Sequence, residues 1–226
     1  MAEGTLKLNK RVFPHDGLFY VMGMEEADKL MIHEIAAVIC MTLFYLAYFY
    51  KQVLLAKQGI RTNRLARGQK PVKTMRVEMA VLAATYGMAV IQYGSSGLSR
   101  YLVGIPLPKD VRSTGVFLMV IGVAFFIAAL ATMKDNWRAG VEENQQTVMV
   151  IQGVYRISRN PAFVGFDLLY LGSALAMPNV VIFLAAICCI LILHLQILQE
   201  EKLLPGLFGS AYLDYKKHTP RYLLFF

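Results

Sequence analysis

Four apolar runs, each about 20 residues long, constrain this chain more than any other feature of its sequence. They cover residues 35–56, 77–95, 113–133 and 179–198. A helix of that length spans the hydrocarbon core of a bilayer, and continuous apolar runs favour helices over strands, which would alternate. The composition agrees, because 57% of the residues are hydrophobic and only 17% are charged. The sequence therefore predicts an all-α polytopic membrane protein.

A fifth apolar run, residues 162–177, is shorter and is separated from the last run by Pro178 and Asn179. We expect these two runs to form a C-terminal helical hairpin whose shorter arm is tilted or spans only part of the bilayer. The whole chain, 1–226, then forms one membrane domain, with N-terminal helices in 1–133 and a functional core in 134–226. Small residues in the third run are expected to let helices approach closely, namely Gly115, Gly122, Ala124 and Ala128.

Lysine and arginine are distributed unevenly between the two ends of the five predicted spans. The loop after the first span, the loop after the third span and the C-terminal tail together carry 15 of them, against 7 at the opposite end. The positive-inside rule therefore predicts an outside N-terminus and a cytoplasmic tail, with any site at that end facing the cytoplasm of a cell membrane. The basic loop 57–73 is either a topology determinant or an anionic-lipid contact.

The formal charge of +8 does not by itself indicate nucleic-acid binding. Its basic residues lie between apolar runs rather than along one soluble face, which favours membrane orientation or contact with phosphate lipids. Motifs for a P-loop, GxGxxG, HExxH and GxSxG are absent, and the histidines and cysteines lack metal-ligand spacing. No metal is therefore expected. His194 is interpreted as a satisfied or interface-reaching histidine rather than a ligand.

Polar residues gather where the last apolar run ends. Gln196, Gln199 and Glu200 have i, i+3, i+4 spacing and form one stripe on a helix, from which Glu201 turns away. Such a cluster is either an ordinary exit from the membrane or a site facing the loop that contains Arg159. A carboxylate there could hold a ribose diol or an amine, or pair with an arginine.

A set of motifs in residues 134–221 occurs in a specific order and spacing. The set comprises Thr147-Val148-Met149-Val150, Gly153-x-Tyr155, Arg159-Asn160-Pro161-x-Phe163-x-Gly165, Glu200-Glu201, Phe208-Gly209-x-x-Tyr212-x-x-Tyr215 and Pro220-Arg221. Together they resemble the isoprenylcysteine carboxyl methyltransferase family, which is related to the phospholipid N-methyltransferases. Trp137-Arg138-x-Gly140 is also similar to bacterial members of that family.

The resemblance implies an integral membrane enzyme that uses S-adenosylmethionine. The residues it assigns to the cofactor are Thr147, Val148, Met149, Val150, Tyr155, Asn160, Pro161, Ala162, Phe163 and Glu200. Arg159 and Glu201 are the expected catalytic residues, and Gln196 and Arg221 the expected acceptor-binding residues. The assignment suits the cofactor, whose carboxylate, amine, ribose and sulfonium require an arginine, a carboxylate and aromatic or amide contacts. The general base is left open between His194, Glu201 and a tyrosine.

Two positions depart from the family pattern. Asn160 replaces the usual histidine, and it forms hydrogen bonds without titrating near neutrality. Gln196 occupies the position at which the prenylcysteine enzymes have an arginine for the substrate carboxylate, and a neutral amide cannot make that bidentate contact. We therefore expect an acceptor other than a prenylcysteine carboxylate, although a carboxylate, a phospholipid amine and a small thiol all stay open.

Two other functions fit part of the pattern. Membrane sterol reductases have a similar C-terminal arrangement of Gly, Tyr and Pro-Arg around NADPH, and a non-catalytic membrane anchor needs only the apolar runs. An anchor would not need polar stripes converging from two segments, and no inverted repeat indicates a transporter. The expected partners are membrane lipids and a lipophilic substrate that arrives from the bilayer, with no nucleic acid. The oligomeric state and the pathway are left open.

Overall fold

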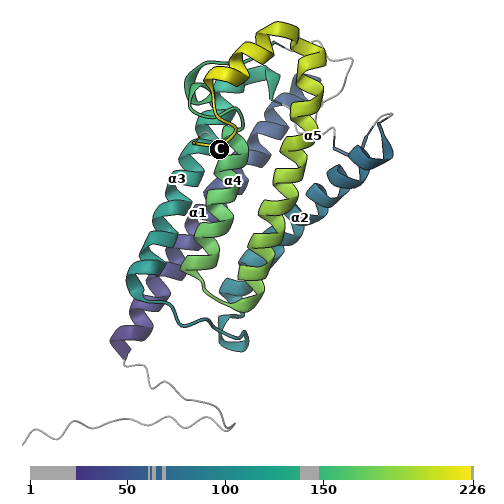
Figure 1. The fold of residues 1–226 in the computed structure, drawn as a ribbon. Helices are drawn as coiled ribbons and strands as arrows, with labels where there is room; N and C mark the ends of the chain where they lie inside the picture. The colour runs from purple at the N-terminus through teal and green to yellow at the C-terminus, as the bar shows by residue number, and fades with distance from the viewer. Residues whose placement is uncertain (1–23, 61, 63–64, 68–69, 138–147, 225–226) are drawn as a thin grey trace, which may run out of the picture.

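The protein is an antiparallel helical bundle in a computed structural model that describes residues 24–60, 62, 65–67, 70–137 and 148–224 (Figure 1). Its helices are α1 (Met24–Lys57), α2 (Val72–Gly97), α3 (Lys109–Met133), α4 (Pro161–Ala176) and α5 (Val180–His218). Short 3-10 turns follow α2, follow α3 and precede α4, namely η1 (Ser99–Tyr101), η2 (Lys134–Asn136) and η3 (Gly153–Arg156). Within the described ranges the extended pairing is limited to one isolated bridge between Gly104 and Asn179. The predicted all-α class is confirmed.

Four of the five helices are long and apolar enough to cross a membrane, and α4 is the shorter apolar helix. Large apolar side chains remain on the outer surface, as at Ile35, Val90 and Leu191, which are 52%, 73% and 60% exposed. A surface of this kind is stable against lipid rather than water. The protein is therefore an integral membrane protein, as the apolar runs predicted. Helices α1 and α5 extend well beyond those runs, to Met24 and to His218.

Helices α3 and α4 pack with their backbones in contact. Two glycine pairs face each other, Gly115 with Gly172 and Gly122 with Gly165. A Cβ atom at Gly172 would lie 2.6 Å from the carbonyl oxygen of Gly115, and one at Gly165 would lie 2.9 Å from that of Gly122. The predicted close approach is thus confirmed at both glycines of α3. It is wrong for Ala124, whose side chain is exposed, because that residue lies on a different face of the helix.

The C-terminal hairpin turns at residues 177–179, as predicted. Asn179 caps α5, and its side-chain oxygen accepts from the Ile182 amide at 3.0 Å. The connection between α2 and α3 is bonded to this turn, with Val180 N donating to the Val103 oxygen and Ile105 N to the Pro178 oxygen. The two arms are antiparallel, but α4 packs most extensively on α3 and α5 on α2 (Figure 1).

Helix α5 bends near its C-terminal end. Pro205 lies inside the helix, and Gly209 has φ +57°, a left-handed conformation that glycine adopts without strain. The last turns of α5 therefore lie across the end of the bundle (Figure 1). There the Tyr215 hydroxyl donates to the carbonyl oxygen of Tyr155. Beyond the kink at Gly209 the chain continues as a helix to His218.

Candidate active site

A cavity of about 200 Å³ lies at the end of the bundle where α5 bends. All five helices contribute to its wall, as do the loop after α1 and the segment before α4. Those two connections and the end of α5 come from the three basic stretches of the sequence, so the charge pattern correctly placed them at one end. Which side of a membrane that end faces is still a prediction.

Most of the residues predicted to contact a cofactor line this cavity. They are Val148, Met149, Val150, Tyr155, Asn160, Pro161, Ala162, Phe163 and Glu200. Thr147 lies outside the described residues, as do Arg138 and Gly140 of the other motif, whereas Trp137 lines the cavity. The structure thus brings together residues that are up to 52 positions apart in sequence. Within the described ranges no three His, Cys, Asp or Glu side chains are grouped as a metal site requires.

The entry to α4 is shaped by its local sequence. Pro161 occupies the first helical turn, where a missing N–H costs nothing, and so α4 begins immediately after Asn160. Gly153 has φ +57°, and a Cβ there would lie 2.9 Å from the Thr132 hydroxyl oxygen, so only glycine lets η3 pass this close to α3. This turn carries Tyr155 into the cavity wall.

Tyr155 is buried, and its pKa is raised well above the usual tyrosine value. The main cause is loss of solvent around the phenol, and the neighbouring Tyr215 and Glu200 raise the pKa further because their ionised forms repel a phenolate. The phenol of Tyr155 therefore stays protonated at neutral pH. It is suited to packing and hydrogen-bond donation rather than to accepting a proton.

Gln196 and Glu200 form a polar pair on the α5 side of the cavity. The Gln196 Nε2 atom donates to Glu200 Oε1 at 2.9 Å, and Gln196 Oε1 is buried without a partner. Glu200 is the sole carboxylate among the described residues that line the cavity. Gln199, the third member of the predicted stripe, does not line it and instead contacts the Thr74 hydroxyl at 3.4 Å.

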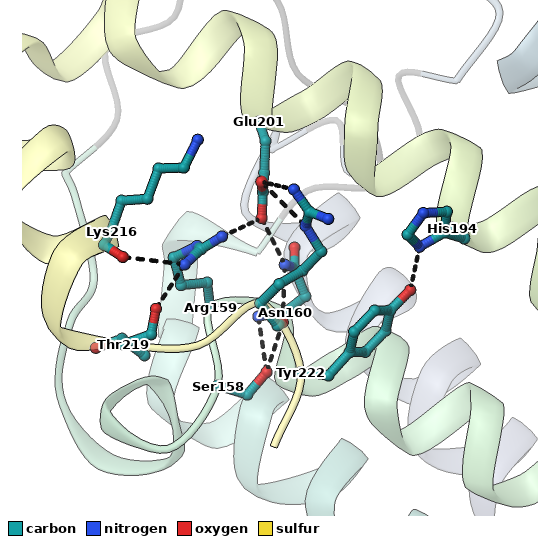
Figure 2. Close-up of polar contacts among 9 residues, drawn as sticks. Ser158, Arg159, Asn160, His194, Glu201, Lys216, Thr219 and Tyr222 are labelled. Carbon is teal, nitrogen blue, oxygen red and sulfur yellow. Dashed lines mark hydrogen bonds and ion pairs between the residues drawn. The ribbon is translucent and has the colours of Figure 1, made fainter. Parts of the chain in front are cut away.

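Glu201 and Arg221, predicted to act in catalysis and acceptor binding, do not line the cavity. Glu201 Oε1 accepts from Arg159 NH2 at 2.9 Å, and Oε2 accepts from Arg221 NH2 at 2.9 Å (Figure 2). Arg159 does line the cavity, and its Nε atom is buried without a partner. Of the three residues, only Arg159 is positioned to contact a ligand there.

His194 also lies off the cavity wall. Its Nδ1 atom is 2.7 Å from the Tyr222 hydroxyl oxygen, and the two rings stack (Figure 2). The interpretation of His194 as a satisfied histidine agrees with this contact. Of the three candidates for a general base, His194 and Glu201 are therefore engaged elsewhere, and only tyrosines line the cavity.

Several cavity residues come from the first two helices and their loop, outside the functional core that the sequence predicted in residues 134–226. They are Tyr48, Leu65, Val81 and Thr85. Leu193 and Phe166 extend the same wall on α5 and α4. An aromatic or hydroxyl side chain in an apolar run is usually a packing residue, so nothing in the sequence marked these positions.

Comparisons with known proteins agree with this geometry. Residues 111–211 match the phospholipid methyltransferase family. The matched segment begins in α3 and ends in α5, and it includes η3, α4 and Glu200. The family resemblance inferred from the motifs is thereby confirmed, while membership of a bacterial type stays a prediction.

A mouse protein named Protein-S-isoprenylcysteine O-methyltransferase is 29% identical to this chain over 118 residues. The alignment covers 51% of this chain and 42% of the mouse protein. The chain therefore matches less than half of that relative's length, and α1 and α2 lie outside the segment that matches the phospholipid methyltransferase family.

Proposed function

We propose that this protein is an integral membrane methyltransferase that uses S-adenosylmethionine and acts on a lipophilic or small acceptor. The observation that carries the proposal is the cavity formed by residues 148–150, Tyr155, residues 160–163 and Glu200. These residues lie in the segment that matches the phospholipid methyltransferase family. The named activity of the mouse relative points to the same reaction class.

The polar groups of the cavity complement the proposed cofactor. Glu200 accepts a hydrogen bond from Gln196 but forms no ion pair among the described residues, which suits an amine or a sulfonium. Arg159 Nε is a buried donor without a partner, which suits a carboxylate. Tyr155 and Phe163 supply aromatic surface against which an adenine or a cation can pack.

The residues of this chain act mainly by positioning and by excluding water. Bound S-adenosylmethionine would supply an electrophilic methyl group on a sulfonium. Transfer of such a group requires alignment with the acceptor and a dry site rather than strong acid or base catalysis. Gln196 lies one helical turn before Glu200 on α5, closer to the middle of the membrane, so it is the residue best placed to orient the acceptor.

We further propose that the acceptor is uncharged or carries an amine, and that it enters from the bilayer. The deeper part of the cavity is lined by Val81, Leu193 and other apolar side chains from the spans. Gln196 offers a neutral amide there, and Arg221 is paired with Glu201. A substrate carboxylate would therefore find no free guanidinium beside Gln196, except through Arg159 Nε. The positive-inside pattern supports a cytoplasmic site.

Isothermal titration calorimetry on the purified protein, with a chelator present, tests the cofactor assignment. We expect binding of S-adenosylmethionine or its demethylated product. Glu200→Ala should weaken binding by roughly 1.5–3 kcal/mol, because it removes one charge-assisted hydrogen bond. Gln199→Ala, one position away and off the cavity wall, is the matched control and should leave the affinity unchanged. Binding of NADPH instead would favour the reductase alternative.

A further inference from the structure

The segment after α5, residues 219–222, is bonded along its main chain to the start of α4, and we call it the tail strap. The amide of Arg159 donates to the Pro220 oxygen at 2.9 Å, and Asn160 Nδ2 donates to the Arg221 oxygen at 3.1 Å. Arg159 NH1 also donates to the oxygen of Thr219. No residue of the tail strap lines the cavity, whereas Arg159 and Asn160 both do.

Glu201 links the same elements from the α5 side (Figure 2). Its carboxylate is 6% exposed and accepts four hydrogen bonds, two from Arg221, one from Arg159 and one from Asn160. One buried negative charge is thus placed between two guanidinium groups, and neither oxygen is left without a donor. Removing one partner of a buried pair of this kind leaves an uncompensated charge, so the arrangement resists distortion.

The side chain of Asn160 bonds to Glu201 and to the tail strap instead of capping α4. Asn160 is the N-cap residue of α4, and asparagine at that position usually accepts from an amide of the first turn. Here no side-chain cap bond forms, and the amide side chain contacts Glu201 and the Arg221 oxygen instead. Ser158 adds a second connection. Its hydroxyl accepts from the backbone N–H of Asn160 and donates to the backbone oxygen of Arg221.

Tyr222 anchors the far end of the tail strap on the hairpin. Its hydroxyl is 2.7 Å from His194 Nδ1, and the ring centroids are 5.9 Å apart at an interplanar angle of 16°. His194 precedes Glu201 by two helical turns, about 10 Å along α5. The tail strap is thus held to α5 at two separate levels, through Arg221 and through Tyr222.

We propose that the tail strap is a positioning device for the cofactor side of the cavity, in which Glu201, Arg221, Tyr222 and His194 act through Arg159 and Asn160. Three of the five guanidinium N–H groups of Arg159 are directed to Glu201 and to the carbonyl oxygens of Lys216 and Thr219. Of the two that are left, the Nε–H is buried without a partner, so it can bond to a ligand. This assigns Glu201 and Arg221 a positioning role in place of the direct roles predicted from the sequence. What Arg159 and Asn160 hold rests on the proposed function.

Hydrogen exchange measured by mass spectrometry tests the linkage without any ligand. Arg221→Gln and Tyr222→Phe should each speed exchange in the peptide that contains the Arg159 amide, by about tenfold, because its acceptor on Pro220 is released. The matched controls are Lys217→Gln and Tyr50→Phe, which change exposed side chains outside the network and should leave exchange in that peptide unchanged. Unchanged exchange in both strap variants of the folded protein would overturn the proposal.

A double-mutant cycle on S-adenosylmethionine affinity separates positioning from direct contact. Arg221→Gln and Arg159→Lys should each weaken binding on the order of tenfold, since lysine cannot reproduce the fork of contacts. The double variant should be no weaker than the weaker single variant, because Arg221 acts through Arg159. Additive losses would show that Arg221 acts independently and would overturn the proposal. If the unmodified protein binds no S-adenosylmethionine, the proposed function fails, and the exchange measurement alone decides the role of the tail strap.

Discussion

Gln196 is the cavity residue on which the proposed choice of acceptor depends. It is 1% exposed, donates to Glu200 and has its own oxygen unpartnered. A buried acceptor without a donor is costly, so a ligand that brings an N–H or O–H group to Gln196 Oε1 would be favoured. A carboxylate at the same place would bring one acceptor against another.

Substitution of Gln196 should therefore change the choice of acceptor. We expect little turnover of a farnesylated cysteine analogue by the natural protein. Gln196→Arg should raise that turnover about tenfold or more, since a charge-assisted hydrogen bond contributes about 1.5–3 kcal/mol. Both forms should be assayed with labelled S-adenosylmethionine against the prenylcysteine, phosphatidylethanolamine and a small thiol.

Gln199→Arg is the control for the added charge, because Gln199 lies on the same helix but not in the cavity wall. It should not raise turnover of the prenylcysteine. Efficient methylation of the prenylcysteine by the unmodified protein would contradict this reading of Gln196. The substrate carboxylate would then have to be held elsewhere, with Arg159 Nε as the available donor.

Helix α4 depends on α3 more than on its hairpin partner. The two glycine pairs let the backbones touch, and this contact fixes the depth at which Phe163 and Phe166 enter the cavity. A helix of 16 residues has little lipid-facing surface to hold it in place, so close packing is the main stabilising interaction along its length.

Gly172→Ala tests that dependence. The added methyl would lie 2.6 Å from the Gly115 oxygen and 2.6 Å from Met119 Cγ, so the helices must separate. We expect a loss of about 1–3 kcal/mol in the free energy of unfolding, measured by thermal or denaturant unfolding in detergent. Gly87→Ala in α2 is the control, because nothing lies within 4 Å of the added Cβ. Equal stability of the two variants would mean that the α3–α4 contact is looser than described.

The candidate site lies at one end of the bundle, which we call the functional end. The cavity, the tail strap, the loop after α1 and the bend of α5 lie there, together with most of the basic residues. At the opposite end, Arg112 is buried and donates to the Ala176 oxygen, which satisfies the last turn of α4. The candidate site and the excess of basic residues thus lie at the same end of the molecule's long axis.

That axis predicts the orientation in a cell membrane. Lys217→Cys places an exposed thiol at the functional end, and Val103→Cys places one at the other end. In intact cells a membrane-impermeant thiol reagent should label the cysteine at 103 and should reach the one at 217 only after permeabilisation. The unmodified protein, treated with the same reagent, is the control and measures any labelling of Cys40, Cys188 and Cys189. The reverse pattern would place the cavity outside the cytoplasm.

The sequence alone determined the existence of the five apolar helices, the approximate bounds of α2, α3 and α4, and the family resemblance. Each of these depends on short-range information: the length of an apolar run, the spacing of Gln196 and Glu200 on one helix, or a motif such as Arg159-Asn160-Pro161. The polar stripe also separated Glu200 from Glu201 correctly, since adjacent helical residues point about 100° apart. That separation did not reveal what each carboxylate contacts.

Only the tertiary structure decided which residues surround the cavity and which support it. Tyr48 lines the wall because α1 packs on α3 and α4, and Thr85 does so because α2 packs on α5. Nothing in the sequence near either residue records that packing. Glu201 and Arg221 lie outside the cavity wall because the segment after α5 bonds to Arg159, 60 positions earlier in the sequence. This contact brings Arg221 into an ion pair with Glu201. Such contacts depend on how distant segments meet, which residue patterns within one segment do not encode.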